Sequence, residues 1–171
     1  MELDLSWITP SLAIGGCFPV EHTELLRDHR IGAVVDLRAE ACDDAALLDH
    51  HGIAFLHLPT PDMCGVSCAM LSLGVEFVAG HLAADRKVLV HCQYGIGRSA
   101  LLGLCVLVHD GHSPADALAL AKDRRARVSP SQQQYEAWVG WLTGFRNRPD
   151  VSWDIPTFAE FAAVAYRHLQ A

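Results

Sequence analysis

Short apolar runs alternate along the chain with longer segments in which apolar residues recur at helical spacing. Four of these runs have the length of a strand and are nearly continuous in apolar residues, which is typical of strands that are covered on both faces of a sheet. They are Leu12–Ile14, Ala33–Leu37, Ala54–Leu58 and Lys87–His91. Strands that alternate with helices predict an α/β fold, with a central, mostly parallel sheet of four to five strands flanked by helices.

Helices are predicted in the intervals between these strands. The clearest helix starts are Ser113-Pro114 and Ser129-Pro130, where a serine cap precedes a proline at the first helical position. The apolar run Ala100–Val108 predicts a buried helix and is far shorter than the ~20 residues of a membrane span. The other predicted helices cover residues 21–29, 42–50, 67–82 and 156–169.

The chain shows no internal repeat and no low-complexity stretch. Its 171 residues suit one compact domain, and 51% of them are apolar, which is enough for a substantial core. We therefore expect a single domain over residues 1–171, in which residues 151–171 form a C-terminal helical extension packed on the rest.

The formal net charge of −7 argues against a nucleic-acid partner, because such proteins normally present a basic surface. Residues 1–5 contain two acids and no basic stretch, so they do not match a signal peptide. With no apolar run of membrane length, this predicts a cytoplasmic protein without a membrane partner, and we expect a monomer. The six cysteines form no CxxC pair and no zinc-ligand pattern, so we expect reduced thiols and no metal.

Cys92 stands in a different context from the other cysteines, because it directly follows the strand that ends at His91. A seven-residue loop, Cys92 to Arg98, separates this strand from the buried helix. Such a loop points several backbone N–H groups at one place, and the helix dipole adds to their positive field. This field lowers the pKa of a cysteine at its base, and the planar fork of Arg98 can hold two oxygens of a phosphoryl group.

The loop between the thiol and the guanidinium is predicted to bind the phosphate through its backbone. Glycines allow the backbone to curl and to take unusual dihedral angles. No cofactor is needed, because Arg98 and the backbone supply the positive field. The predicted phosphate-binding residues are Gln93, Tyr94, Gly95, Ile96, Gly97 and Arg98.

The segment from His91 to Ser99, HCQYGIGRS, resembles the HCxxGxxR(S/T) signature of the protein tyrosine phosphatase superfamily. The order of elements over roughly residues 5–145 is similar to the dual-specificity branch, including small bacterial members and kinase-associated phosphatases. This resemblance implies a phosphomonoester hydrolase that forms a phosphocysteine at Cys92. It also implies that Ser99 helps the thiolate to leave and that His91 is a structural partner of the loop.

The resemblance also assigns a general acid. Asp62 follows the third predicted strand and lies 30 residues before Cys92, about where dual-specificity enzymes carry this acid. It would protonate the leaving oxygen and then act as base on the hydrolytic water. The simpler alternative is that Pro61-Asp62 only makes a turn.

Two further positions match features of the family. Arg125 lies in an arginine-then-proline stretch, where it supports the phosphate site, binds a second anion or is only a solvated basic helix end. Gln134 falls where some members carry a water-positioning glutamine, and an exposed polar helix residue is the simpler account. Cys64 and Cys68 lie just beyond Asp62, and we hypothesise that one of them forms a reversible disulfide with oxidised Cys92.

The residues between Cys92 and Arg98 include no lysine. This favours a single phosphate on a protein, as phosphotyrosine or phosphoserine/threonine, over a polyphosphoinositide. The alternatives are a phosphatase of phosphoinositides or other small molecules, a phosphate-binding pseudophosphatase, and another thiolate enzyme such as a sulfurtransferase or arsenate reductase. The length of the loop and its position in mid-chain argue against the last of these.

Overall fold

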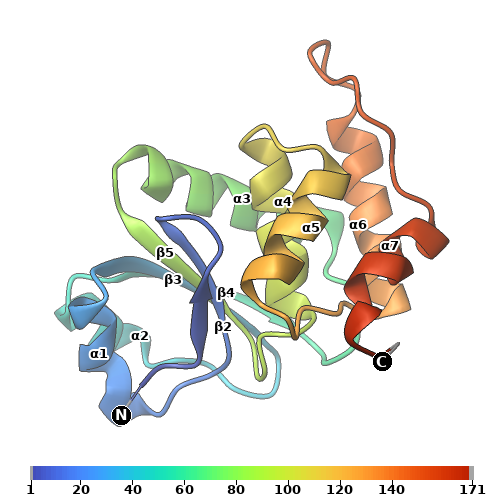
Figure 1. Cartoon of the computed structure of the whole chain (residues 1–171). Helices are drawn as coiled ribbons and strands as arrows, with labels where there is room; N and C mark the ends of the chain where they lie inside the picture. Colours follow the sequence, from blue (N-terminus) through green and yellow to red (C-terminus); the bar gives the residue numbers. More distant parts are fainter. Residues whose placement is uncertain (1, 170–171) are drawn as a thin grey trace.

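The computed structural model describes residues 2–169 and contains a five-stranded sheet with helices on both faces (Figure 1). The strand order is β1-β2-β5-β3-β4, and every neighbouring pair is parallel except β1 and β2. The predicted α/β fold with a mostly parallel sheet is thus confirmed. The strands are β1 Leu5–Trp7, β2 Leu12–Gly15, β3 Ile31–Arg38, β4 Ala54–Thr60 and β5 Lys87–His91.

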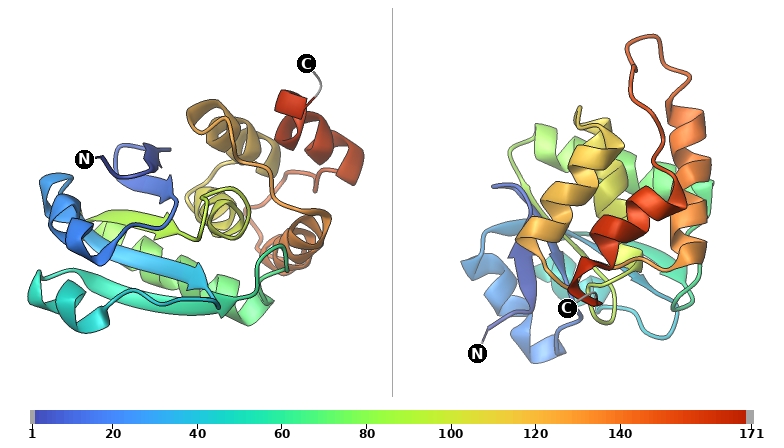
Figure 2. Two further views of the ribbon diagram at one scale, coloured as in Figure 1. Left: turned by 90° about the horizontal axis from the view of Figure 1, so that it is seen from below. Right: turned by 45° about the vertical axis from the view of Figure 1, so that its right-hand side comes forward.

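Two apolar cores lie on opposite faces of this sheet. Helices α1 and α2 cover one face, where Leu26 and Leu48 pack against Val34 and Leu89. Helices α3 and α4 cover the other face, and α5, α6 and α7 add a further layer (Figures 1 and 2). The helices are α1 Thr23–Asp28, α2 Ala45–His50, α3 Cys68–Ala83, α4 Arg98–His109, α5 Pro114–Arg124, α6 Gln132–Phe145 and α7 Phe158–Ala165, with short 3-10 turns at Val20–His22 and Arg167–Leu169.

Four helix starts differ from the prediction, among them that of the C-terminal helix, which was expected from 156 and begins at Phe158 after the cap Thr157. The segment 21–29 begins with the 3-10 turn before α1, and the segment 42–50 is helical only from Ala45, after the cap Asp44. Helix α6 begins after Ser131 and not after Ser129, because Ser131 and Gln134 form a capping box in which each side chain accepts the other's backbone N–H. The backbone N–H of Ser129 instead donates to Ile96 of the loop.

Helix α4 is the centre of the larger core. Of its residues, all from Arg98 to Val108 are buried, which confirms the buried helix expected from the apolar run. It contacts α3, α5 and α6 as well as the sheet. Surrounded in this way, α4 has a rigid position, and so has the loop that precedes it.

Helix α7 packs on α5 and α6 through the buried side chains of Phe161 and Ala165. The ammonium of the buried Lys122 on α5 donates to the carbonyl of Ala165 at 2.7 Å and so ties this helix to the core. The assignment of one domain with an extension at 151–171 stays a prediction, and Met1, Gln170 and Ala171 lie outside the described residues. Over residues 2–169, no helix has both the length and the apolar character to cross a membrane.

Candidate active site

The site lies at the carboxyl ends of the parallel strands, where β5 gives way to α4. Strand β5 ends at His91, the loop of seven residues follows, and α4 begins at Arg98. Because β3 and β4 run parallel to β5, the segments that follow them reach the same edge. The structure therefore brings Glu40 and Asp62 to the loop of Cys92.

The Cys92 sulfur faces into the loop. It lies 3.3 Å from the hydroxyl oxygen of Ser99, which is itself fully buried at the first turn of α4. Burial favours the neutral thiol, but hydrogen bonds from the Ser99 hydroxyl and from the backbone N–H groups of Ser99, Gly95 and Tyr94 outweigh it. Together they hold the pKa of Cys92 below that of an ordinary thiol.

Arg98 closes the loop and is almost completely buried. Its Nη1 and Nη2 donate to the two carboxylate oxygens of Glu40, each at 2.7 Å, and Nη1 also donates to the carbonyl of Thr60 at 2.8 Å. Its Nε is one of two buried side-chain atoms without a hydrogen-bond partner in the described part of the chain. A buried donor without a partner costs free energy, so this N–H is suited to an oxyanion in the loop.

Sequence reasoning missed Glu40. Its hydrogen bonds with Arg98 lower its pKa from 4.5 to about 2. Because this pKa is depressed in the fold, the ion pair is complete above pH 4.5 and is lost as the pH falls through about 2. The sequence placed Glu40 shortly after the strand that ends near Leu37, but only the structure shows that this strand neighbours the one before Cys92.

Asp62 lies at the mouth of the site. Its carboxylate is 3.3 Å from Nη2 of Arg98, is 56% exposed and accepts the backbone N–H of Met63 at 3.0 Å. A surface hollow opens here, lined by Ala39, Glu40, Pro61, Asp62, Gln93 and Tyr94. The predicted acid, Asp62, therefore lies near Arg98 and is accessible to a substrate.

His91, directly before the loop, is held by a carboxylate. Its Nε2 lies 2.6 Å from a carboxylate oxygen of Asp43, so this nitrogen is the one that donates, and its Nδ1 is 3.4 Å from the carbonyl of Cys92. Asp36, Asp43 and His91 present ligand atoms within 4.8 Å of one another, as a metal site would. However, Arg38 binds both carboxylates, at 2.9 and 2.8 Å, and offsets part of their negative charge. This cluster is better explained as a support for the strand end.

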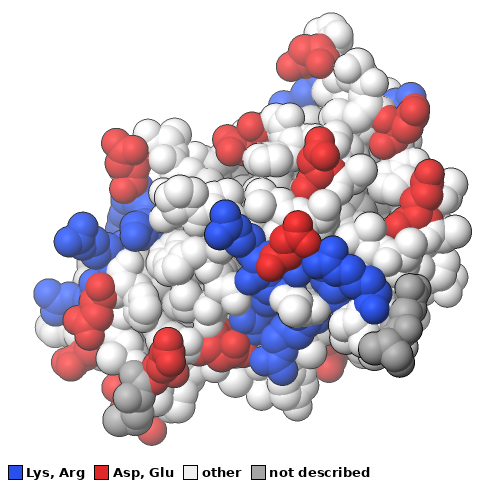
Figure 3. All heavy atoms as spheres, in the orientation of Figure 1, with Lys and Arg blue, Asp and Glu red and all other residues white. Residues whose placement is uncertain are grey.

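Arg125 and Gln134 both lie against the loop. Arg125 is buried and donates to the carbonyls of Gly95 and Tyr94, so it is not a solvated helix end. Figure 3 shows basic side chains gathered over the end of α5, the helix that Arg125 directly follows. Gln134 is also buried, so the interpretation as an exposed polar residue is wrong. Its amide lies so close to Gly97 that a Cβ there would collide with it.

Only one of the two loop glycines has an unusual backbone conformation. Gly95 has φ +65°, whereas Gly97 has φ −118° and a Cβ there would meet only the amide end of the Gln134 side chain. A Cβ at Gly95 would also collide with Arg125 and with the backbone of Gly15, which cannot move easily.

We therefore expect Gly95→Ala to lower kcat/KM for an aryl phosphate by about 10²-fold, the cost of misplacing a catalytic group by about 1 Å. Gly80 on α3 has open space around it and is the matched control. Gly80→Ala should keep full activity and unfold at a slightly higher temperature. Steady-state kinetics and thermal melts measure both effects, and an active Gly95→Ala variant would show that the loop tolerates a different backbone there.

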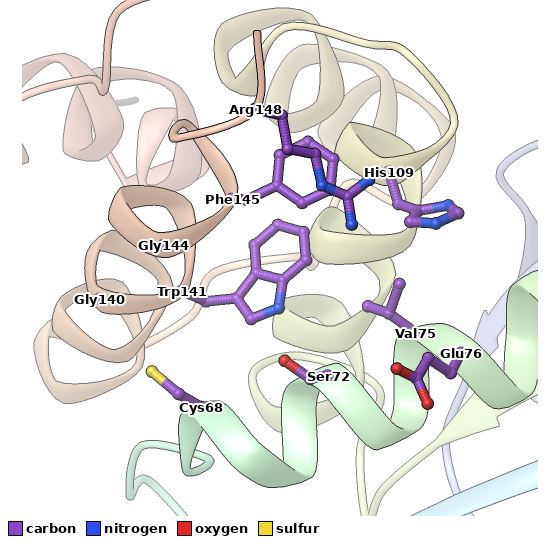
Figure 4. A pocket seen from close by; sticks show the side chains of 10 residues that line it. All are labelled: Cys68, Ser72, Val75, Glu76, His109, Gly140, Trp141, Gly144, Phe145 and Arg148. Carbon is purple, nitrogen blue, oxygen red and sulfur yellow. The ribbon is translucent and has the colours of Figure 1, made fainter. Parts of the chain in front are cut away.

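A second hollow lies away from the loop, between α3, α4 and α6 (Figure 4). Trp141 and Phe145 of α6 stack at 4.9 Å on one side of it, and none of the loop residues lines it. Cys68 faces this hollow, beside Gly140. All six cysteines are free thiols, and the hypothesis of a disulfide between Cys92 and Cys64 or Cys68 stays a prediction.

Comparisons with known proteins show the family to which the chain belongs. Residues 18–112 match the Tc-R-P family model, described as a polymorphic toxin system DSP-PTPase phosphatase. The chain is 31% identical over 99 residues to dual specificity protein phosphatase Mpk3 of Drosophila melanogaster, covering 57% of this chain and 24% of that protein. It is 30% identical over 97 residues to phosphatidylglycerophosphate phosphatase PTPMT1 of Arabidopsis thaliana, covering 56% of this chain and 29% of that protein.

The chain thus spans well under two thirds of the length of these curated relatives. The solved structure of Tk-PTP in its active form superposes with a TM-score of 0.76 at 25% identity, over 84% of this chain and 99% of that one. The family model covers more than half of the chain and includes Asp62, Cys92 and Arg98. The chain therefore belongs to the dual-specificity branch of the protein tyrosine phosphatase superfamily.

Proposed function

We propose that this chain hydrolyses phosphomonoesters through a phosphocysteine intermediate at Cys92. The observation that carries this proposal is the donor set around one point. The Cys92 sulfur lies 3.3 Å from the Ser99 hydroxyl, backbone N–H groups of the loop lower its pKa, and the buried Nε–H of Arg98 has no partner among the described residues. A thiolate beside fixed donors can attack a phosphorus atom while those donors hold its equatorial oxygens.

In the first step the thiolate forms the S–P bond, and the P–O bond to the alcohol breaks. The electron pair goes to the leaving oxygen, which takes a proton from Asp62. In the second step Asp62 removes a proton from water, the water oxygen attacks phosphorus, and the S–P bond breaks to give inorganic phosphate. The Ser99 hydroxyl, 3.3 Å from the sulfur, stabilises the thiolate as it leaves.

Asp62→Asn should slow hydrolysis by about 10²-fold with phenyl phosphate, and less with p-nitrophenyl phosphate. The reason is that phenolate needs a proton in order to leave, whereas nitrophenolate is a stable anion. Asp150→Asn, at an exposed position beyond α6, is the control and should behave as the wild type. Equal losses with the two esters would assign Asp62 to positioning and not to proton transfer.

The substrate class we propose is phosphotyrosine and phosphoserine/threonine in proteins. The side chains of Gln93, Tyr94 and Ile96 add no positive charge for further phosphates, which supports a single phosphate group. The likeness to PTPMT1, a phosphatidylglycerophosphate phosphatase, favours a lipid or other small phosphomonoester as the second candidate. Phosphate release from a panel of phosphopeptides, phosphoinositides and phosphatidylglycerophosphate distinguishes the two.

The alternatives that do not form a phosphocysteine are tested by trapping the covalent intermediate at Cys92. Rapid acid quench during turnover, followed by peptide mass spectrometry, should find phosphate on the peptide that contains Cys92. A persulfide there would indicate sulfur transfer. Phosphate binding without any turnover would indicate a pseudophosphatase.

A further inference from the structure

The outer side of the loop is held at four consecutive backbone carbonyls. The carbonyl of Gln93 accepts the N–H of Cys17 at 3.1 Å, and that of Ile96 accepts the N–H of Ser129 at 3.0 Å. The two carbonyls between them are held by one side chain. Arg125 donates from Nη2 to Tyr94 at 3.0 Å and from Nε to Gly95 at 2.8 Å.

These outward bonds determine where the inward donors point. A trans peptide is planar, and its C=O and N–H point in opposite directions. A carbonyl that is held outside the loop therefore turns the N–H of the next residue toward the inside. Through the carbonyls of Tyr94 and Gly95, Arg125 orients the N–H groups of Gly95 and Ile96. The Gly95 N–H is one of the donors that lower the pKa of Cys92.

Arg125 is in turn held by the N-terminal segment. Its Nη1 and Nη2 donate to the two carboxylate oxygens of Asp4, each at 3.0 Å, and Nη1 also lies 3.3 Å from the hydroxyl of Ser6. The guanidinium is 4% exposed and the carboxylate 46%. A buried guanidinium without a counter-ion is unfavourable, so Asp4 both compensates its charge and fixes its plane.

We propose that Asp4, acting through Arg125, is a positioning residue for the anion loop. The pair holds two peptide units with their N–H groups turned toward Cys92 and the substrate phosphate. This inference deepens the proposed function and rests on it, since it concerns the same thiolate and the same bound oxyanion. It places a residue of the N-terminal segment, 121 positions before its partner, in control of the catalytic loop.

The test compares Asp4→Ala, Asp4→Asn and Arg125→Lys with a matched control, Arg127→Ala. Arg127 binds the same carboxylate at 3.4 Å, but it has no hydrogen bond with the loop among the described residues. The first readout is the pH midpoint of Cys92 alkylation by iodoacetamide, followed by mass spectrometry of the Cys92 peptide. The second is the inhibition constant of orthovanadate, and the third is the melting temperature.

Asp4→Ala and Arg125→Lys should each raise the alkylation midpoint and weaken vanadate inhibition about 10- to 100-fold, the range for losing charge-assisted hydrogen bonds. Asp4→Asn keeps one acceptor oxygen, so its alkylation midpoint and its vanadate inhibition constant should lie between those of these two variants and those of the wild type. Arg127→Ala should stay within about twofold of the wild type, because it removes only an exposed ion pair.

A lower melting temperature with an unchanged alkylation midpoint and vanadate constant would overturn the inference, since a merely structural pair has that signature. If Arg125→Lys does not fold, the variants of the half-exposed Asp4 still decide the question. The alkylation midpoint requires no turnover. A wild type that releases no phosphate would thus contradict the proposed function. The alkylation midpoints of the variants would still test the role of Asp4.

Discussion

Cys92→Ser is expected to lower phosphate release by at least about 10⁴-fold, as for the loss of a catalytic nucleophile. A serine hydroxyl has nearly the size of the thiol but is not ionised at neutral pH, so the same donors would surround a group that cannot attack. Binding of phosphate or vanadate should persist, because Arg98 and the loop N–H groups remain. Hydrolysis of p-nitrophenyl phosphate and a vanadate titration measure the two effects.

Cys42→Ser is the matched control, because this thiol is exposed and has no hydrogen bond with the loop among the described residues. It should keep the activity of the wild type. If Cys92→Ser were as active as this control, the thiolate mechanism would be wrong and Cys92 would be only a small buried residue.

In the wild type, the rate of Cys92 alkylation should also fall on the acid side of its pH profile. Since the fold lowers the pKa of Cys92, the thiolate and its hydrogen bonds persist to a lower pH than those of an ordinary thiol and are lost as the pH falls through that lowered pKa. The alkylation rate of Cys92 should therefore rise at lower pH than that of Cys42, because partial desolvation and the nearby carboxylates of Asp36 and Asp43 raise the pKa of Cys42.

Arg98→Lys is expected to lower kcat/KM by about 10³-fold, at the upper end of the loss of a preorganised oxyanion donor. An ammonium is a compact point charge and has no planar fork. It cannot bind both oxygens of Glu40 and the carbonyl of Thr60 while it also offers the N–H that now has no partner. Both kcat/KM and vanadate affinity should fall.

Arg124→Lys is the matched control, since Arg124 lies exposed at the end of α5. Its activity and vanadate affinity should equal those of the wild type. If Arg98→Lys had a lower melting temperature but an unchanged vanadate affinity, Arg98 would be a structural partner of Glu40 and not the residue that binds the phosphate.

The sequence predicted the parts of this site that are contiguous. From His91 to Ser99 the strand, the loop and the helix follow one another, so their order alone places the thiol, the N–H groups and the guanidinium together. The same local reasoning failed at β1, because Ser6 interrupts its three residues Leu5–Trp7 and leaves no continuous apolar run. It also failed at Ser129, where the nearby loop takes up the backbone N–H.

The carboxylates that hydrogen-bond with the side chains of the site could not be predicted in this way. Glu40 lies 58 positions from Arg98, Asp43 lies 48 from His91, and Asp4 lies 121 from Arg125. Each pairing depends on the strand order, in which β5 lies between β2 and β3. The sequence pattern shows that strands exist and which residues they bury, but it does not show which strands are neighbours.

By itself, therefore, the sequence determined the α/β class and the anion loop, because hydrophobic periodicity and loop chemistry act between residues close in the chain. Tertiary structure alone decided which carboxylate holds each arginine and which way the loop carbonyls face. Those choices depend on contacts made when parallel strands bring their carboxyl ends to one edge.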